Sequence, residues 1–164
     1  MKTLILGMGN PILSDDGVGL LAAEKLRERV PGADVASSAM IGLSLFDLII
    51  GYDTLFIIDA MTTRDGKLGE LKKIGEDDRR GTLHLFSSHG MNIFDLMELG
   101  VRCGYDMPRL SAFYGIEIGD EVAFGETLSP ALNEKLPVLV EEIIDDINTV
   151  LFSRKRIEAT DCVM

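Results

Sequence analysis

The stretch LILGMGNPILSDDGVG, residues 4–19, decides the fold. It begins with an apolar run typical of a buried strand, and a glycine turn around Gly7 and Gly9 follows directly. Two adjacent carboxylates, Asp15 and Asp16, then stand where a helix is expected to begin. This position is the carboxyl end of a predicted parallel strand, which is where open α/β sheets form their ligand sites.

The glycine turn matches only the beginning of the GxGxxG pattern of dinucleotide-binding proteins, because Ile12 stands where the third glycine is expected. The acidic residue expected to bind a ribose is also missing, since residues 36–38 are Ala-Ser-Ser. Two carboxylates at the start of the helix would also repel a pyrophosphate. A nucleotide-binding regulatory domain is therefore the third of three functional hypotheses, and the other two follow below. The simplest structural alternative, in which Asp15 or Asp16 only caps a helix, explains one carboxylate but not the pair.

The composition fits one globular domain. The chain has 164 residues, of which 46% are hydrophobic, enough to form a core and too many for a disordered coil. With 16 Lys and Arg against 27 Asp and Glu, the net charge of −11 argues against a nucleic-acid partner. No apolar run approaches the ~20 residues that span a bilayer, so we expect a cytoplasmic protein without membrane insertion. Cys103 and Cys162 indicate neither a disulfide framework nor a zinc site.

Strand and helix patterns alternate along the chain. Strands are predicted over residues 2–8, 34–38, 54–59, 68–74 and 110–118. Helices are predicted over residues 16–30, 43–50, 90–99 and 129–151. The last helix has Ser129 as its N-cap and Pro130 as its first residue, and Pro137 should either kink it or mark where the helix proper begins. This order predicts a single three-layer α/β domain over residues 1–152, with a twisted, mostly parallel sheet of about five strands and helices on both faces. Residues 153–164 are expected to form a flexible tail.

Three polar side chains are predicted to meet at one edge of this sheet. Asp16 follows the first strand, Asp59 ends the third, and His89 lies at the start of a later helix. Because parallel strands end at the same edge, these residues can converge although they are far apart in sequence. Two carboxylates and one imidazole form a site with open positions that suits a borderline divalent ion such as Ni²⁺ or Zn²⁺.

Each of these residues also has a purely structural interpretation. Asp59 could cap a turn, and His89 could be an ordinary solvent-facing residue. His84 lies within the alternating segment 82–86 and is interpreted as a strand residue rather than a ligand. Asp15 is interpreted as a cap or as a group that supports the ligands, since two adjacent residues rarely contact the same ion.

The sequence resembles a known family at three places. The segments GMGNPILSDDGVG at 7–19, FIIDA at 56–60 and SSHGMNIFDL at 87–96 are similar, in order and spacing, to segments of the maturation endopeptidases of [NiFe] hydrogenases. The first signature is specific, whereas the Asp and His segments alone would not be. The resemblance covers most of the chain and agrees with the α/β fold that the residues predict.

The resemblance implies a metal site and a substrate. In that family, an acidic residue at the second position of the acidic pair, an Asp that ends the third strand and a His that opens a later helix bind a metal, and these positions correspond to Asp16, Asp59 and His89. The family removes a short C-terminal extension from the precursor of a hydrogenase large subunit after nickel insertion, and nickel in the substrate is what these residues would recognise. We expect such an enzyme to act as a monomer. One departure is Ser-Ser-Ala at 37–39, where many members have Asp-Gly-Gly, and it bears on substrate preference.

Two mechanisms are compatible with the sequence. The metal could polarise the scissile carbonyl and activate water, or it could be only an anchor while Asp16 or Asp59 acts as the catalytic general base. Other protease classes find no support, because Ser14 lacks a GxSxG context, neither cysteine lies in a nucleophile motif and no HExxH is present. The second functional hypothesis is a non-enzymatic, chaperone-like metal-binding module that holds an immature hydrogenase subunit.

Overall fold

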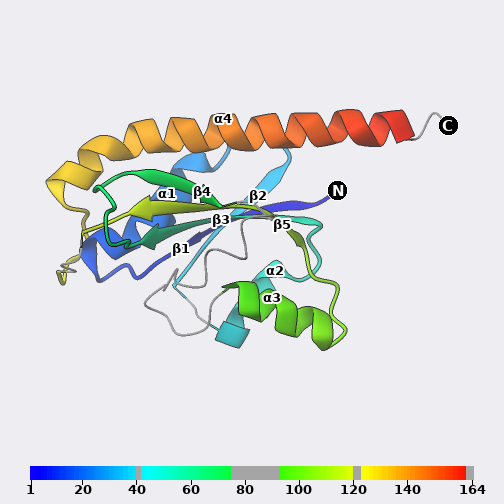
Figure 1. Ribbon diagram of the computed structural model, residues 1–164, viewed down its shortest axis with the longest axis horizontal. Helices are drawn as coiled ribbons and strands as arrows, with labels where there is room; N and C mark the ends of the chain where they lie inside the picture. The colour runs from blue at the N-terminus through cyan, green and yellow to red at the C-terminus, as the bar shows by residue number, and fades with distance from the viewer. Residues whose placement is uncertain (40–41, 75–92, 120–122, 162–164) are drawn as a thin grey trace.

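A central sheet with helices on both faces forms the protein, as the computed structural model in Figure 1 shows. The structure describes residues 1–39, 42–74, 93–119 and 123–161, with side chains up to residue 153. The strands are β1 (Thr3–Met8), β2 (Ala33–Ser38), β3 (Thr54–Met61), β4 (Leu71–Ile74) and β5 (Arg109–Glu117). The described helices are α1 (Val18–Leu26), α2 (Phe46–Ile49), α3 (Ile93–Arg102) and α4 (Pro130–Asp161), with the 3₁₀ turns η1 (Ser14–Gly17) and η2 (Gly42–Leu45).

The sheet has the strand order β2-β1-β3-β5-β4. β1 is parallel to β2 and β3, β3 is parallel to β5, and β4 runs antiparallel beside β5. Every residue of β1 and β3 is buried, as expected for parallel strands that are covered on both faces. The carboxyl ends of β1, β3 and β5 therefore lie at one edge of the sheet, which we call the carboxyl edge.

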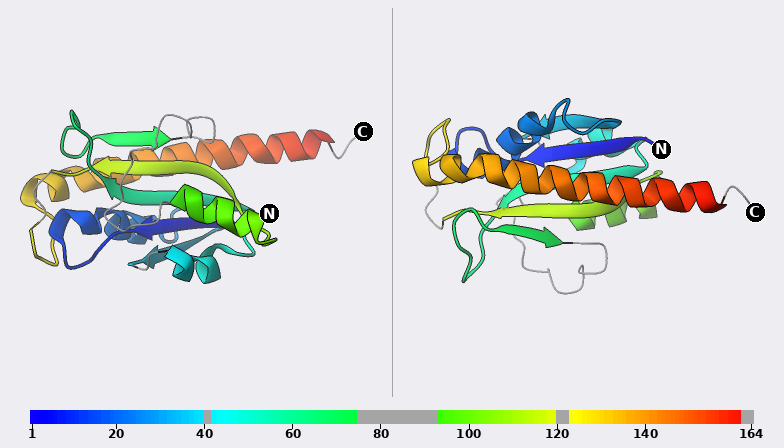
Figure 2. Two further views of the ribbon diagram at one scale, coloured as in Figure 1. Left: turned by 60° about the horizontal axis from the view of Figure 1, so that its bottom comes forward. Right: turned by 90° about the horizontal axis from the view of Figure 1, so that it is seen from above.

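Two hydrophobic cores hold the three layers together. Phe56 and Ile58 of β3 pack with α1 and α4, whereas Leu55 and Ile57 pack with α2 and α3, because successive side chains of a strand point to opposite faces. Figure 2 shows α4 lying over the sheet, with its C-terminal end projecting beyond the strands. Its apolar stripe is buried in the first core through Leu132, Leu136, Leu139, Val140, Ile143, Ile144 and Ile147.

The predicted fold class is confirmed, but several boundaries differ. The helix predicted over residues 16–30 is shorter, because η1 precedes it and α1 ends at Leu26. The chain leaves the helix there since Arg27 is extended, with ψ 130°, and Glu28 has a φ of +67°. The helix predicted over 43–50 is divided into η2 and α2. The beginning of the helix predicted over 90–99 lies outside the described residues, which include α3 from Ile93 onward.

The final helix is longer than predicted. It begins as expected, with the N–H of Leu132 donating to Oγ of Ser129 at 3.4 Å, and Pro137 lies inside it without ending it. α4 continues to Asp161 and so includes most of the segment 153–164 for which the sequence predicts a flexible tail. The apolar stripe ends near residue 151, but Arg, Lys, Glu and Ala in the following turns favour a helix even without packing. In the described part of the chain, no helix combines the length and apolar character needed to cross a membrane.

Candidate functional site

Asp16 is held in place by the glycine turn that precedes it. Gly9 has a φ of +146°, and a Cβ at this position would lie 2.1 Å from the carbonyl oxygen of Asp16, so only glycine fits. The backbone N–H of Asn10 donates to Oδ2 of Asp16 at 3.1 Å. Asp16 lies in η1 and is only 7% exposed. The turn therefore positions a largely buried carboxylate at the carboxyl edge.

Asp59 lies within β3, opposite Gly115 of β5, and is 2% exposed. Its Oδ1 accepts the N–H of Ala60 at 2.9 Å. The sequence predicts that the strand ends at Asp59, but β3 continues to Met61. A role as a cap for the turn after the strand therefore does not fit the structure. The continuing strand instead fixes the backbone on both sides of this buried acid.

Two glycines let α1 approach the strands that contain or precede the acids. A Cβ at Gly19 would lie 2.3 Å from the carbonyl oxygen of Met8 and 2.5 Å from that of Ile58. A Cβ at Gly7 would lie 2.5 Å from the Cβ of Ala23. Larger residues at either position would push α1 away from β1 and β3. Gly19 thus provides the close helix–strand packing that the third glycine provides in a dinucleotide-binding turn.

The two carboxylates interact electrostatically. Burial raises the pKa of Asp59, the hydrogen bond from the N–H of Ala60 lowers it, and the negative charge of Asp16 raises it further, so the pKa of Asp59 is about 7. Among the described residues, no Lys, Arg or His forms an ion pair with Asp59. A proton or a divalent cation would therefore stabilise this acidic pair.

The structure brings together two of the three residues predicted to bind a metal. Asp16 and Asp59 interact near the carboxyl edge, whereas His89 lies outside the described residues, as does His84. Within the described ranges, no three His, Cys, Asp or Glu side chains are placed so that they could hold one ion. The three-ligand metal site therefore stays a prediction.

Asp15 does not cap α1. The residue before α1 is Gly17, and no side chain caps this helix. Instead, Oδ1 of Asp15 accepts the backbone N–H of Ser129 at 2.6 Å, directly before α4. The hydroxyl of Ser14 donates to the carbonyl oxygen of Thr127 at 2.9 Å. These bonds connect the turn that contains the acidic pair to the segment before the last helix, so Asp15 supports the turn from outside.

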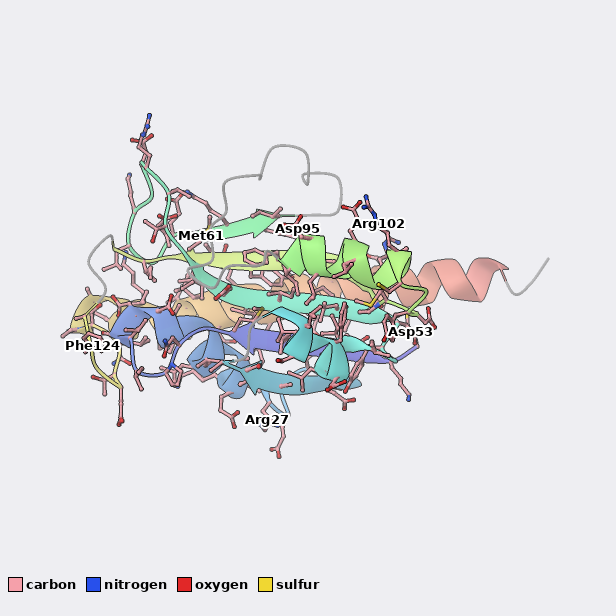
Figure 3. The ribbon with its side chains drawn as sticks, turned by 90° about the horizontal axis from the view of Figure 1, so that it is seen from below. Arg27, Asp53, Met61, Asp95, Arg102 and Phe124 are labelled. Atoms are coloured by element: carbon pink, nitrogen blue, oxygen red, sulfur yellow. The ribbon has the colours of Figure 1, made fainter. Side chains whose placement is uncertain are left out.

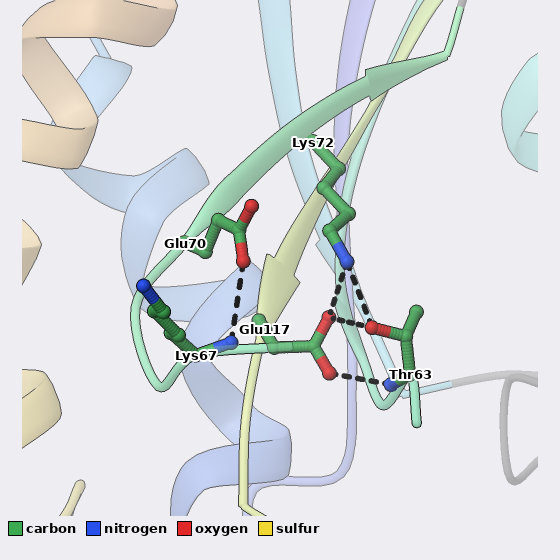
Figure 4. A network of polar contacts seen from close by, with 5 residues as sticks. All are labelled: Thr63, Lys67, Glu70, Lys72 and Glu117. Carbon is green, nitrogen blue, oxygen red and sulfur yellow. Dashed lines mark hydrogen bonds and ion pairs between the residues drawn. The ribbon is translucent and has the colours of Figure 1, made fainter. Parts of the chain in front are cut away.

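Glu117 is a third buried carboxylate, and the sequence pattern did not indicate it as a site residue. It ends β5 and accepts hydrogen bonds from the N–H of Thr63 and, at 2.9 Å, from the Oγ1 of that residue (Figure 4). Nζ of Lys72 lies 3.3 Å from Oε2 of Glu117, and in the same loop the N–H of Lys67 donates to Glu70 at 3.2 Å. The network fixes the loop between β3 and β4. The available signal was a single acid that follows the apolar run of residues 112–116.

The serine-rich departure from the family pattern lies beside the glycine turn. β2 pairs with β1 so that Ser37 is opposite Gly7 and Ser38 is opposite Met8. The hydroxyl of Ser37 donates to the carbonyl oxygen of Leu20 at 3.4 Å, which connects the end of β2 to α1. The segment 37–39, for which the resemblance predicts an effect on substrate preference, thus begins at the carboxyl edge.

Comparisons with known proteins agree on one family. A family model described as hydrogenase maturation protease (HycI) matches residues 22–146, more than half of the chain. The hydrogenase 2 maturation protease of Escherichia coli (strain K12) is 23% identical over 158 residues, covering 90% of this chain and 96% of that protein. The solved structure of the hydrogenase maturating endopeptidase HybD from E. coli is similar with a TM-score of 0.75 at 21% identity, covering 92% of this chain and 94% of that chain. The [NiFe] hydrogenase maturation protease HybD from Thermococcus kodakarensis is similar with a TM-score of 0.66 at 27% identity, covering 90% of this chain and 99% of that chain.

Proposed function

Because the chain belongs to the hydrogenase maturation protease family, we propose that it removes the C-terminal extension of a [NiFe] hydrogenase large-subunit precursor after nickel insertion. One observation supports this proposal above the others. Asp16 and Asp59, the acids that would meet the nickel of the substrate, interact at the carboxyl edge and lie in elements that close packing holds together. In this proposal the enzyme acts as a monomer in the cytoplasm.

Nickel belongs to the substrate, since it arrives in the precursor. Asp16, Asp59 and His89 offer it two carboxylates and one imidazole, a ligand set that suits Ni²⁺. Asp59 is buried without a counter-ion among the described residues, so a divalent cation would relieve its repulsion with Asp16. Recognition of nickel would restrict cleavage to precursors that have received their metal.

Cleavage of the peptide bond requires a group that takes a proton from the attacking water. Where the metal serves only as an anchor, Asp59 is the better candidate for this general base, because its pKa of about 7 in the metal-free protein lies near the working pH. Water adds to the scissile carbonyl and its proton passes to the carboxylate of Asp59. The same proton then passes to the nitrogen that leaves as the C–N bond breaks. The cycle thus returns Asp59 to its carboxylate form, while Asp16 keeps its place beside it as the second catalytic acid.

The test uses the full-length protein and a purified precursor, prepared with and without nickel. We expect mass spectrometry to detect a released C-terminal peptide from the nickel-loaded precursor and none from the nickel-free one. Stable binding without release of a peptide would instead identify a chaperone-like module. Release from the nickel-free precursor would contradict nickel recognition.

A further inference from the structure

Residues 12–14 and 124–126 form a short parallel ladder near the acidic pair. The N–H of Gly125 donates to the carbonyl oxygen of Ile12 at 3.0 Å, and the N–H of Ser14 donates to that of Gly125 at 2.7 Å, with Leu13 opposite Gly125. Ile12 and the residue before Gly125 each directly precede one of the two bridged residues, so they form a pair on neighbouring segments of the chain. The residue before Gly125 is a phenylalanine, Phe124.

Both apolar side chains of this pair are exposed. Phe124 is 87% exposed, the most exposed large apolar side chain among the described residues, and Ile12 is 53% exposed. Figure 3 shows Phe124 at one end of the molecule, with Asp53 toward the other. Neighbouring exposed apolar side chains, especially with an aromatic member, are typical of protein-binding surfaces.

The ladder is fixed before any partner binds. The hydroxyl of Ser14 bonds Thr127, and the carboxylate of Asp15 bonds the N–H of Ser129, so both chains of the ladder are held by side chains as well as by backbone. A rigid aromatic side chain on a fixed backbone loses little conformational entropy on binding. The pair is therefore pre-organised to contact another molecule.

The position and charge of the two segments that contain Ile12 and Phe124 favour one kind of partner. Ile12 is in the same loop as Asn10, whose N–H donates to Asp16, so Ile12 lies close in the chain to a residue that contacts the acidic pair. The charged residues of segments 10–17 and 123–129 are all acidic, namely Asp15, Asp16 and Glu126. A partner segment with basic residues next to an apolar residue would complement these two acidic segments.

We propose that the Ile12–Phe124 pair is a docking contact for the protein substrate, and that the docked segment presents an apolar side chain flanked by Lys or Arg. The inference rests on the proposed function, because it takes the hydrogenase large-subunit precursor as the occupant. The pair binds this substrate and does not touch the reacting atoms.

The main test compares Phe124→Ala with the wild-type full-length protein. Biolayer interferometry measures the Kd of the nickel-free precursor, and cleavage kinetics with the nickel-loaded precursor give kcat and KM. We expect Kd and KM to rise about tenfold with kcat unchanged, because only binding is lost. Phe152→Ala is the matched control, since Phe152 is 65% exposed on α4 and lies outside the ladder, and it should change neither constant.

The outcomes separate the docking proposal from the proposed function. If the wild type cleaves the precursor and Phe124→Ala changes neither Kd nor KM, the docking contact is wrong and the protease function stands. If the wild type binds the precursor without cleaving it, the protease function is wrong, and the Kd of Phe124→Ala alone decides the docking contact. If the wild type neither binds nor cleaves the precursor, both proposals are wrong.

A second variant tests the charge of the docked segment. Glu126→Gln should raise the Kd for the precursor about threefold at low ionic strength, and this difference should shrink as salt is added. Glu134→Gln, an exposed acid on α4, is the control and should leave the Kd unchanged. An unchanged Kd for Glu126→Gln would overturn the expectation of basic residues in the docked segment.

Discussion

Gly19 of α1 lies against Asp59 of β3 so closely that a Cβ at Gly19 would lie 2.9 Å from the Cα of Asp59. The two acids come from different elements, so their separation depends on how close α1 and η1 come to β3. The absence of a side chain at Gly19 therefore determines the separation of Asp16 and Asp59. The electrostatic effect of Asp16 on Asp59 is therefore a consequence of backbone packing.

Gly19→Ala should lower the free energy of unfolding by about 3 kcal/mol, because the added methyl group would collide with backbone carbonyl oxygens that have little room to move. Urea denaturation measures the effect. Gly119→Ala is the control, since a Cβ there would meet nothing within 4 Å, and it should change the free energy by less than about 0.5 kcal/mol. Equal stability of the two variants would contradict the close approach of α1.

Asp59→Asn should change how stability depends on pH. The pKa of Asp59 is about 7 in the folded protein, above the ~4 of an unfolded chain, so folding favours the protonated form. The stabilising contribution of this group is complete below about pH 4 and is lost as the pH rises to about 7. The amide keeps the acceptor for the N–H of Ala60 and does not ionise. Above pH 7 the variant should therefore exceed the wild type in stability, by about 4 kcal/mol at most.

Thermal unfolding followed by circular dichroism at several pH values between 4 and 8 measures this difference. The exposed Asp106→Asn is the control and should follow the wild-type profile. If Asp59→Asn also followed that profile in parallel, Asp59 would not be the group that titrates.

Asp16→Asn and His89→Ala should each remove cleavage without unfolding the protein. Asp16→Asn deletes a negative charge but keeps an oxygen that can accept the N–H of Asn10. Cleavage of the nickel-loaded precursor should fall by at least about 100-fold, while the midpoint of thermal unfolding changes by only a few degrees. Peptide release and thermal unfolding are measured for each variant.

Two controls accompany these substitutions. Asp15→Asn keeps an acceptor for the N–H of Ser129, so it should cost about 1 kcal/mol of stability at most and leave cleavage intact. His84→Ala should also leave cleavage intact. Full cleavage by Asp16→Asn or by His89→Ala would remove that residue from the site, and full cleavage by both would reject nickel recognition by these residues.

Lys72→Met should destabilise the protein by about 2 kcal/mol, because it leaves the buried carboxylate of Glu117 without its cation. The effect stays moderate since Lys72 is itself partly exposed and water can replace part of the interaction. The double variant Lys72→Met/Glu117→Gln should be more stable than Lys72→Met alone, because the amide can still accept from Thr63. Urea denaturation of the wild type, Lys72→Met, Glu117→Gln and the double variant gives the coupling energy between the two side chains. A coupling energy of zero would show that the ion pair adds no stability.

The sequence was sufficient for the sheet and for the position of the acids. The uninterrupted apolar residues of β1 and β3 predict strands buried on both faces, and the structure has them in the centre of the sheet. Asp16 follows a turn in which Gly9 leaves no room for a Cβ. Its place after β1 could therefore be predicted from the neighbouring residues. The electrostatic interaction between Asp16 and Asp59 then follows from parallel pairing of β1 and β3.

Contacts between distant segments could not be predicted in the same way. Nothing near Asp15 indicates that its acceptor oxygen binds Ser129, and nothing near Lys72 indicates a buried partner at Glu117. Hydrophobic periodicity reports which face of an element is buried, and it does not say which polar groups meet across the fold. It also misplaced the end of α4, because the apolar stripe marks the end of packing on the sheet and not the end of the helix.

The bonds from Ser14 to Thr127 and from Asp15 to Ser129 also impose an order of assembly on the growing chain. The loop with Asp16 leaves the ribosome before the residues that hold it, which lie more than a hundred positions later in the chain. Contacts of such high sequence separation form only after the intervening chain has been made. A nascent chain that stops before Thr127 can pair β1 with β3, yet it lacks the groups that fix the acidic turn. Synthesis through Ser129 therefore precedes a finished site.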